Sequence, residues 1–198
     1  MEFKITNSEV YGLERAVKAS GNPMRTVIDE SDCEEKDFRR ASKLGNTHAG
    51  EGHDNYLKGI LVHLDVTAPL YWWKQAQRYH WFDFVSSQST MHCLLKFDVS
   101  NQCVPETDPE ILSILSRKVQ DYLAMPEDAP GRTEAWRGLV ASLPCGFCLG
   151  ATMTTNYQQL KTMYNQRRHH KLKEWHIFCD WCESLPHFLE LTGVGEEE

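Results

Sequence analysis

The positions of proline and glycine constrain the fold of this 198-residue chain more than any other feature of its sequence. Proline lacks a backbone N–H and glycine is a poor helix former, so clusters of the two mark element boundaries. Gly21-Asn22-Pro23 ends a predicted helix over Glu9 to Ser20, which follows a short strand. Pro126 to Gly131 separates predicted helices over Pro109 to Leu123 and Glu134 to Ala141. The second half of the chain is therefore expected to be mostly helical.

The segment between these regions combines a strand with a helix. Gly59 to Thr67 has the apolar alternation of a strand. Pro69 stands where a first helical turn begins, which predicts a helix over Leu70 to Arg78. On that helix Gln75 and Arg78 are three positions apart, so we expect them to share one face.

A region near the end of the chain predicts a capped helix. Thr154-Thr155-Asn156 precedes a helical run through Tyr164, and its side chains can cap the first turn. An amphipathic pattern continues to Leu189. Helices combined with a smaller sheet predict an α+β fold. The length and the 41% of apolar residues suit a single domain over residues 1–198.

Charge and hydropathy exclude several classes of protein. The 28 acidic residues outnumber the 21 lysines and arginines, whereas a protein that binds a nucleic acid polymer by counterion release needs the opposite balance. A local basic patch remains compatible with a small phosphate ligand. No segment approaches the ~20 consecutive apolar residues of a membrane helix, and the first residues do not resemble a secretion signal. We therefore expect a cytoplasmic protein with no membrane partner.

The cysteines form two C-x-x-C pairs, Cys145-Gly146-Phe147-Cys148 and Cys179-Asp180-Trp181-Cys182. Four thiolates with this spacing are compatible with a tetrahedral zinc site. The second pair lies in an amphipathic run and the first in an apolar stretch, so both pairs are also compatible with packing as small hydrophobic side chains. We favour packing and expect no metal site.

Three segments concentrate polar side chains that suit a small ligand. The glycine-rich loop over Gly45 to Asp54 is the kind of segment that approaches a ligand closely. Trp73 to His80 and Ser86 to His92 combine an arginine fork for phosphate or carboxylate with Ser, Gln and Thr groups that can read an amide-bearing heterocycle. The combination favours a nucleotide ligand, and a polar, partly buried helix–strand junction is the alternative.

The same residues resemble the signature R-H-R-x-x-S-x-N-x-x-S-x-R-Y of the flavin-dependent thymidylate synthases. Arg78-Tyr79-His80 stands at R-H-R, and Ser86 to His92 resembles the second half of the signature. Gln75 stands three residues before the first arginine, as in the family.

The second half of the chain is similar to the family in order and spacing. Leu143-Pro144 is followed by Thr154-Thr155-Asn156, with the asparagine twelve residues after the proline, and Arg167 stands eleven residues further on. His53 to Lys58 partly matches the family's H-x-x-x-F-E element. The resemblance covers about residues 45 to 175.

The resemblance implies a fold, an activity and an assembly. The fold would have a central, mostly antiparallel sheet flanked by helices. The activity would be C5 methylation of a pyrimidine nucleotide, of the dUMP to dTMP type, with reduced FAD, methylenetetrahydrofolate and NADPH. The assembly would be a homotetramer with its sites between chains.

The resemblance also implies roles for individual residues. Cofactor binding would fall to His53, Asn55, Arg78, Tyr79, His80 and Asn156. Substrate binding would fall to Gln75, Arg78, Ser87, Gln88, Ser89, Thr90 and Arg167. Arg167 is also the expected catalytic residue, because a guanidinium beside the N3–O4 region stabilises the charge that makes C5 nucleophilic. A solvated, basic helix end is the alternative interpretation of Arg167.

Four positions depart from the family pattern. Met91 and His80 each replace an arginine, Lys58 replaces a glutamate, and Gln158 stands where an arginine is usual. A thioether does not bind phosphate as an arginine does. The substrate is therefore a different pyrimidine nucleotide, or its phosphate is held by Arg137, Arg168, Ser89 or Thr90. The remaining alternative is a nucleotide- or flavin-binding homologue with a regulatory role and no synthase activity.

Overall fold

The computed structural model describes residues 1–28, 30–47 and 51–195. The strands are β1 (Lys4–Tyr11), β2 (Leu61–Pro69), β3 (Asp83–Ser87) and β4 (Cys148–Asn156). The α-helices are α1 (Leu13–Ala19), α2 (Glu35–Gly45), α3 (Leu70–Ala76), α4 (Thr90–Cys93), α5 (Pro109–Ala124), α6 (Arg132–Ala141), α7 (Tyr157–Arg167), α8 (Lys173–Glu183) and α9 (Phe188–Thr192). Short 3₁₀ helices are η1 (Asn22–Met24), η2 (Asn55–Gly59) and η3 (Leu94–Lys96).

The four strands form one antiparallel sheet in the order β1-β2-β4-β3, which confirms the predicted α+β fold. The chain divides into two compact units, and every strand contributes residues to both. Unit 1 comprises Met1–Lys4, Val66–Arg78 and Ser86–Ala151. Unit 2 comprises Ile5–Asp65, Tyr79–Val85 and Thr152–Glu198. The prediction of a single domain stays a prediction.

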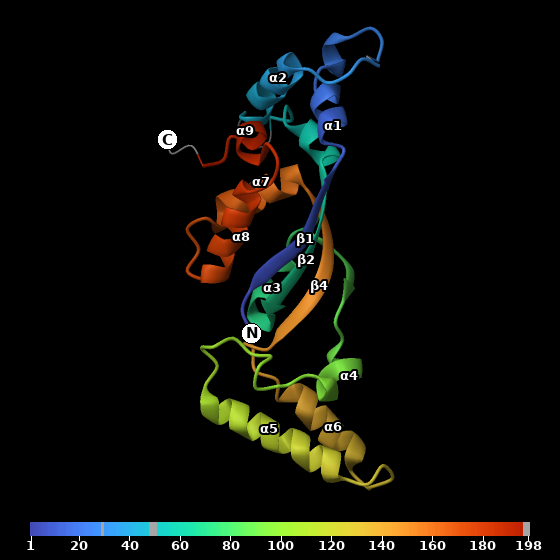
Figure 1. The fold of residues 1–198 in the computed structure, drawn as a ribbon, viewed down its shortest axis with the longest axis vertical. Helices are drawn as coiled ribbons and strands as arrows, with labels where there is room; N and C mark the ends of the chain where they lie inside the picture. Colours follow the sequence, from blue (N-terminus) through green and yellow to red (C-terminus); the bar gives the residue numbers. More distant parts are fainter. Residues whose placement is uncertain (29, 48–50, 196–198) are drawn as a thin grey trace. The chain divides into compact units, whose positions relative to one another are not determined.

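Unit 1 is built around an apolar cluster between its helices. The cluster consists of Leu94, Val99, Cys103, Leu115, Val119, Leu139 and Phe147. Helix α5 begins at a proline, and the Asp108 side chain caps it by accepting a hydrogen bond from the Glu110 N–H at 2.7 Å. Helices α5 and α6 pack against each other (Figure 1). Leu115 and Val119 of α5 and Leu139 of α6 are buried in this cluster.

Helices α7, α8 and α9 of unit 2 pack together (Figure 1). They share an aromatic core. Its largest fully buried side chains include Tyr157, Tyr164, Trp175, Phe178 and Phe188. The Tyr157 and Phe188 rings meet edge to face with centroids 5.2 Å apart, a favourable arrangement for two aromatic rings. The buried polar residues around this core therefore need partners within the unit.

The predicted boundaries agree with the structure where turns and caps define them. Helices α5 and α6 lie where the proline and glycine pattern places them, and Asn156 caps α7 as expected. The helix expected over Glu9 to Ser20 is wrong at its start. Strand β1 continues to Tyr11, and Gly12, with φ 73°, makes the left-handed turn into α1.

The expectation that Gln75 and Arg78 share a helix face is also wrong. Helix α3 ends at Ala76. The Arg78 N–H bonds the Gln75 carbonyl at 3.3 Å, an i to i+3 contact that tightens the end of the helix. Arg78 therefore lies in the turn that follows α3, exposed to solvent.

The two C-x-x-C pairs belong to different units. Cys179 and Cys182 on α8 are buried, and burial raises the pKa of both thiols, that of Cys179 to about 11. In unit 1 Cys148 is buried and Cys145 is exposed. Within the described ranges, no three His, Cys, Asp or Glu side chains gather as metal ligands. The α8 pair packs as protonated, small hydrophobic side chains.

No helix in the described part of the chain has the length and apolar character needed to span a bilayer. The longest is α5 with 16 residues, and it carries charged residues along its length.

Two glycine substitutions test the packing of the units. A Cβ on Gly45 would lie 1.8 Å from the Leu191 carbonyl oxygen, whereas a Cβ on Gly138 would meet nothing within 4 Å. We expect Gly45→Ala to lower the free energy of unfolding by about 1 to 3 kcal/mol through overpacking. Gly138→Ala should raise it by roughly 0.5 to 1 kcal/mol, because alanine is the better helix former. Urea unfolding measures both, and equal stability of the two variants would contradict the close approach.

Candidate functional site

The residues predicted from the sequence are divided between the two units. Unit 1 contains Gln75, Arg78, Ser87, Gln88, Ser89 and Thr90. Unit 2 contains His53, Asn55, Tyr79, His80, Asn156 and Arg167. Each set is described within its own unit.

In unit 1, Gln88 extends the sheet beyond the end of β3. Its N–H donates to the Gly150 carbonyl at 2.8 Å, and its side-chain Oε1 accepts from the Gly150 N–H at 2.7 Å. Ser89 follows as the N-cap residue of α4, and its carbonyl accepts from the Cys93 N–H at 2.9 Å. The Gln88 side chain therefore has a structural role that the sequence did not indicate, while Ser89 and Thr90 lie half-buried beside it.

In unit 2, Arg167 is the last residue of α7 and is held by two aromatic residues. Its Nε donates to the Tyr79 hydroxyl at 2.7 Å. Its Cζ lies 4.6 Å from the Trp175 ring centroid and 5.4 Å from that of Tyr79, both within cation–π range. Trp175 is fully buried, so it presents a fixed surface to the guanidinium. Arg167 is half-buried by these contacts, so it differs from the solvated, basic helix end that was the alternative interpretation.

His170 lies next to this cluster, with its ring 6.3 Å from that of Trp175. Its Nδ1 accepts a hydrogen bond from the Leu172 N–H at 3.1 Å. Burial, followed by the nearby Arg167 and His176 charges, lowers the pKa of His170. At neutral pH the imidazole is therefore uncharged and adds no second positive charge beside Arg167.

A pocket of about 320 Å³ lies at the other end of α7. It is lined by Gly52, Asp54, Asn55, Trp81, Gln158, Gln159 and Thr162. The lining is rich in neutral amides, and the Trp81 side chain is 54% exposed. Such a surface presents hydrogen-bond donors and acceptors beside an aromatic ring, which suits a planar heterocycle.

A buried ion pair supports this pocket. Asp54 and Lys161 are 6% and 7% exposed, and Lys161 Nζ lies 3.3 Å from Asp54 Oδ2. Lys161 Nζ also donates to the carbonyl oxygens of Gly45 at 2.6 Å and Thr47 at 3.3 Å. The second oxygen of Asp54 accepts from Gln158 Nε2 at 2.9 Å. The carboxylate and the ammonium group thus have the partners that burial requires.

The remaining predicted residues of unit 2 differ in their hydrogen bonds and in their exposure to solvent. The Asn156 side chain accepts from the Gln159 N–H at 2.9 Å and is 7% exposed. Asn55 donates to the Gly52 carbonyl at 2.7 Å. His53 is exposed, and the exposed His80 ring meets the Trp81 ring at 4.9 Å. Part of the predicted glycine-rich loop, residues 48–50, lies outside the described residues.

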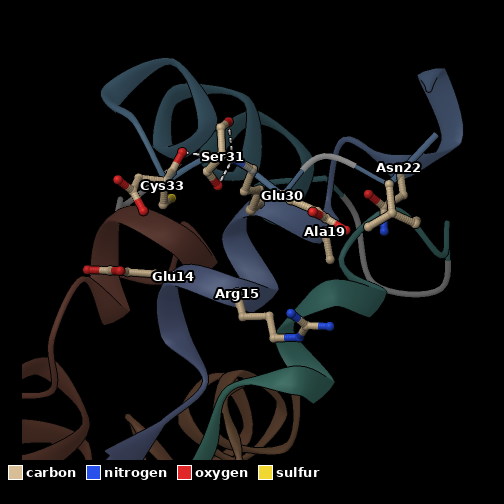
Figure 2. A pocket seen from close by; sticks show the side chains of 10 residues that line it. Glu14, Arg15, Ala19, Asn22, Glu30, Ser31 and Cys33 are labelled. Carbon is tan, nitrogen blue, oxygen red and sulfur yellow. Dashed lines mark hydrogen bonds between the residues drawn. The ribbon is translucent and has the colours of Figure 1, made fainter. Parts of the chain in front are cut away.

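Figure 2 shows another pocket of unit 2, of about 250 Å³, between α1 and the segment before α2. Lys18 on α1 donates to Ser31 Oγ at 2.6 Å and to the Asp32 carbonyl at 2.7 Å, which joins the two walls. None of the residues predicted as site residues is among the described residues that line it. We interpret it as a structural junction.

Arg168, one alternative for holding a phosphate, forms an ion pair in unit 2. Its Nη1 lies 2.7 Å from Glu183 Oε1, which also accepts from the Tyr164 hydroxyl at 2.5 Å. A phosphate at Arg168 would have to compete with this carboxylate.

Several residues of these clusters were missed by the sequence analysis. They are Trp81, Gln159, Lys161, Thr162 and Trp175. Gln158 and Thr162 share one face of α7 at a spacing of four, which the predicted Asn156 cap could have indicated. The two tryptophans carried no such signal, because tryptophan is more often part of a core.

The sequence matches no protein-family model and no curated protein. The fold matches solved structures over almost its whole length. For the flavin-dependent thymidylate synthase ThyX from Helicobacter pylori complexed with FAD and dUMP, the TM-score is 0.69 at 14% identity, covering 97% of each chain. A second structure of that enzyme with FAD and dUMP gives 0.70 at 14% identity, covering 96% of this chain and 97% of that one.

A third match is the UMP/dUMP methylase PolB from Streptomyces cacaoi bound with 5-Br dUMP. Its TM-score is 0.61 at 13% identity, covering 98% of this chain and 95% of that chain. The architecture is therefore the fold of the flavin-dependent thymidylate synthases, as the sequence resemblance predicts.

The contribution of the buried Asp54–Lys161 ion pair to the stability of the protein can be tested by substitution. Lys161→Met would leave the Asp54 carboxylate buried without its cation, so we expect a loss of about 3 to 5 kcal/mol in the free energy of unfolding. Adding Asp54→Asn should recover part of this loss. The exposed pair of Lys36 and Glu34, 2.7 Å apart, provides the control, and Lys36→Met should cost less than about 1 kcal/mol. Equal costs for the two lysine variants in urea unfolding would contradict the role of the buried pair.

Proposed function

We propose that this protein methylates C5 of a pyrimidine nucleotide in a reaction of the dUMP to dTMP type that uses reduced FAD. The observation that carries the proposal is the ordered Arg167 guanidinium, held by the Tyr79 hydroxyl at 2.7 Å and by the Trp175 ring at 4.6 Å. The fold supports it, because the three structures that it matches above are complexes with dUMP or 5-Br dUMP.

Arg167 would stabilise the negative charge that develops on the N3–O4 region of the pyrimidine. A fixed guanidinium stabilises this charge without reorganising during the reaction, which is the main source of electrostatic catalysis. The charge raises the nucleophilicity of C5. In unit 1, Gln75, Arg78, Ser87, Gln88, Ser89 and Thr90 would bind the nucleotide, as the resemblance implies.

The residues of unit 2 fit a flavin. The amides of Asn55, Gln158 and Gln159 can pair with the imide edge of a flavin ring, and Trp81 offers an aromatic surface. When bound, reduced FAD supplies the electrons that convert the transferred one-carbon unit to a methyl group. The residues that would hold it, from the resemblance, are His53, Asn55, Arg78, Tyr79, His80 and Asn156.

The proposal includes the cosubstrates, with methylenetetrahydrofolate as the one-carbon donor and NADPH as the reductant. It also includes a homotetrameric assembly and a location in the cytoplasm. Exposed apolar side chains on and beside β3 favour contact with further copies of the chain. Trp81, Val85 and Met91 are 54%, 60% and 58% exposed.

A regulatory, nucleotide-binding homologue without synthase activity is the second candidate. This candidate is favoured because two positions that could hold a phosphate offer no free positive charge. Met91 is an exposed thioether, and Arg168 is paired with Glu183. This candidate predicts bound nucleotide or flavin without turnover.

Turnover and flavin binding together test the proposal. With FAD, NADPH and methylenetetrahydrofolate, the protein should release tritium from 5-labelled dUMP and retain the visible absorbance of bound flavin. Arg167→Lys should lower kcat by about 100-fold or more while flavin is retained, because lysine lacks the planar fork. Arg117→Lys, at an exposed position on α5, is the matched control. Bound flavin without tritium release from the unaltered protein would favour the regulatory candidate.

A further inference from the structure

Tyr79 occupies a position that the resemblance assigns to the flavin, yet its hydroxyl contacts the end of α7. The hydroxyl accepts from Arg167 Nε at 2.7 Å and donates to Gln166 Oε1 at 3.0 Å. A tyrosine hydroxyl has one proton, and here that proton is directed to Gln166. The oxygen lone pairs therefore face the guanidinium.

The contacts around Arg167 fix different degrees of freedom of its guanidinium. The buried Trp175 ring, whose centroid lies 4.6 Å from Arg167 Cζ, restrains the position of the guanidinium. The Nε–H bond lies within the plane of the guanidinium, so its acceptor sets the direction in which the group points. The Tyr79 and Trp175 rings are 6.2 Å apart and inclined at 72°, so they contact each other as well.

Tyr79 also joins segments that are distant in the sequence. It lies in the turn after α3, whereas Gln166 and Arg167 are 87 and 88 residues further along. One phenol therefore holds two consecutive residues at the end of α7. As a neutral group it orients the guanidinium without neutralising its charge.

We infer that Tyr79 is a positioning residue, which orients the Arg167 guanidinium toward the pyrimidine instead of binding the flavin. The inference rests on the proposed function for its catalytic consequence. Its geometric part rests on the two hydrogen bonds of the hydroxyl and on the ring contacts.

The test removes the hydroxyl and keeps the ring. Tyr79→Phe should lower kcat by about tenfold to a hundredfold, the value of one hydrogen bond to a charged group, with KM and flavin binding within about twofold of the unaltered protein. In an Arg167→Lys background the same change should have no further effect, because Tyr79 acts through Arg167. Tyr122→Phe is the matched control, since Tyr122 is a half-buried tyrosine whose ring lies 4.4 Å from Arg132 Cζ.

A second readout does not depend on activity. The Nε–H of Arg167, assigned by its loss in Arg167→Lys, should give an NMR signal that exchanges slowly with water. The signal should exchange faster in Tyr79→Phe and be unchanged in Tyr122→Phe. Loss of flavin from Tyr79→Phe, additive losses in the double variant, or an unchanged Nε–H signal would each overturn the inference. If the unaltered protein has no turnover, the proposed function fails, and the NMR comparison still decides whether Tyr79 orients Arg167.

Discussion

The register of α7 is the constraint on which the candidate site of unit 2 depends. The Asn156 side chain accepts from the Gln159 N–H and fixes the residue at which the helix begins. The helical repeat then sets the direction of each side chain on α7. Gln158 and Thr162 line the pocket, and Lys161 is buried beside Asp54. Arg167 lies about 16 Å along the axis, at the end of the helix. A shift of one residue would turn each of these side chains by about 100°.

The parts of the fold that could be predicted from the sequence are those with local causes. A proline at the start of α5, the glycine and proline turn before α6 and the asparagine cap of α7 each act within a few residues. The end of α3 was not predictable in this way. No breaker stands between Gln75 and Arg78, and the helix ends because the chain turns there in the folded structure.

The contacts made by the proposed site residues could not be predicted from the sequence. The predicted Asn156 cap and the helical run through Tyr164 agree with α7, which continues to Arg167. The contacts of Arg167 with Tyr79 and of Asp54 with Lys161 join residues 88 and 107 positions apart. Such pairs depend on how the chain packs, so a single sequence carries no direct signal for them. The sequence resemblance indicated the positions, and their partners are found only in the folded chain.

The three oxygen partners of Lys161 have a consequence for its chemistry. An ammonium group has three N–H donors, and here they meet the carbonyl oxygens of Gly45 and Thr47 and the carboxylate of Asp54. The Lys161 side chain is also only 7% exposed, so a reagent in solution does not reach its amine. Lys161 is therefore shielded from acylating reagents while unit 2 remains folded. Its acylation would report local opening of the segment that ends α2, a different kind of motion from the fraying of the chain ends.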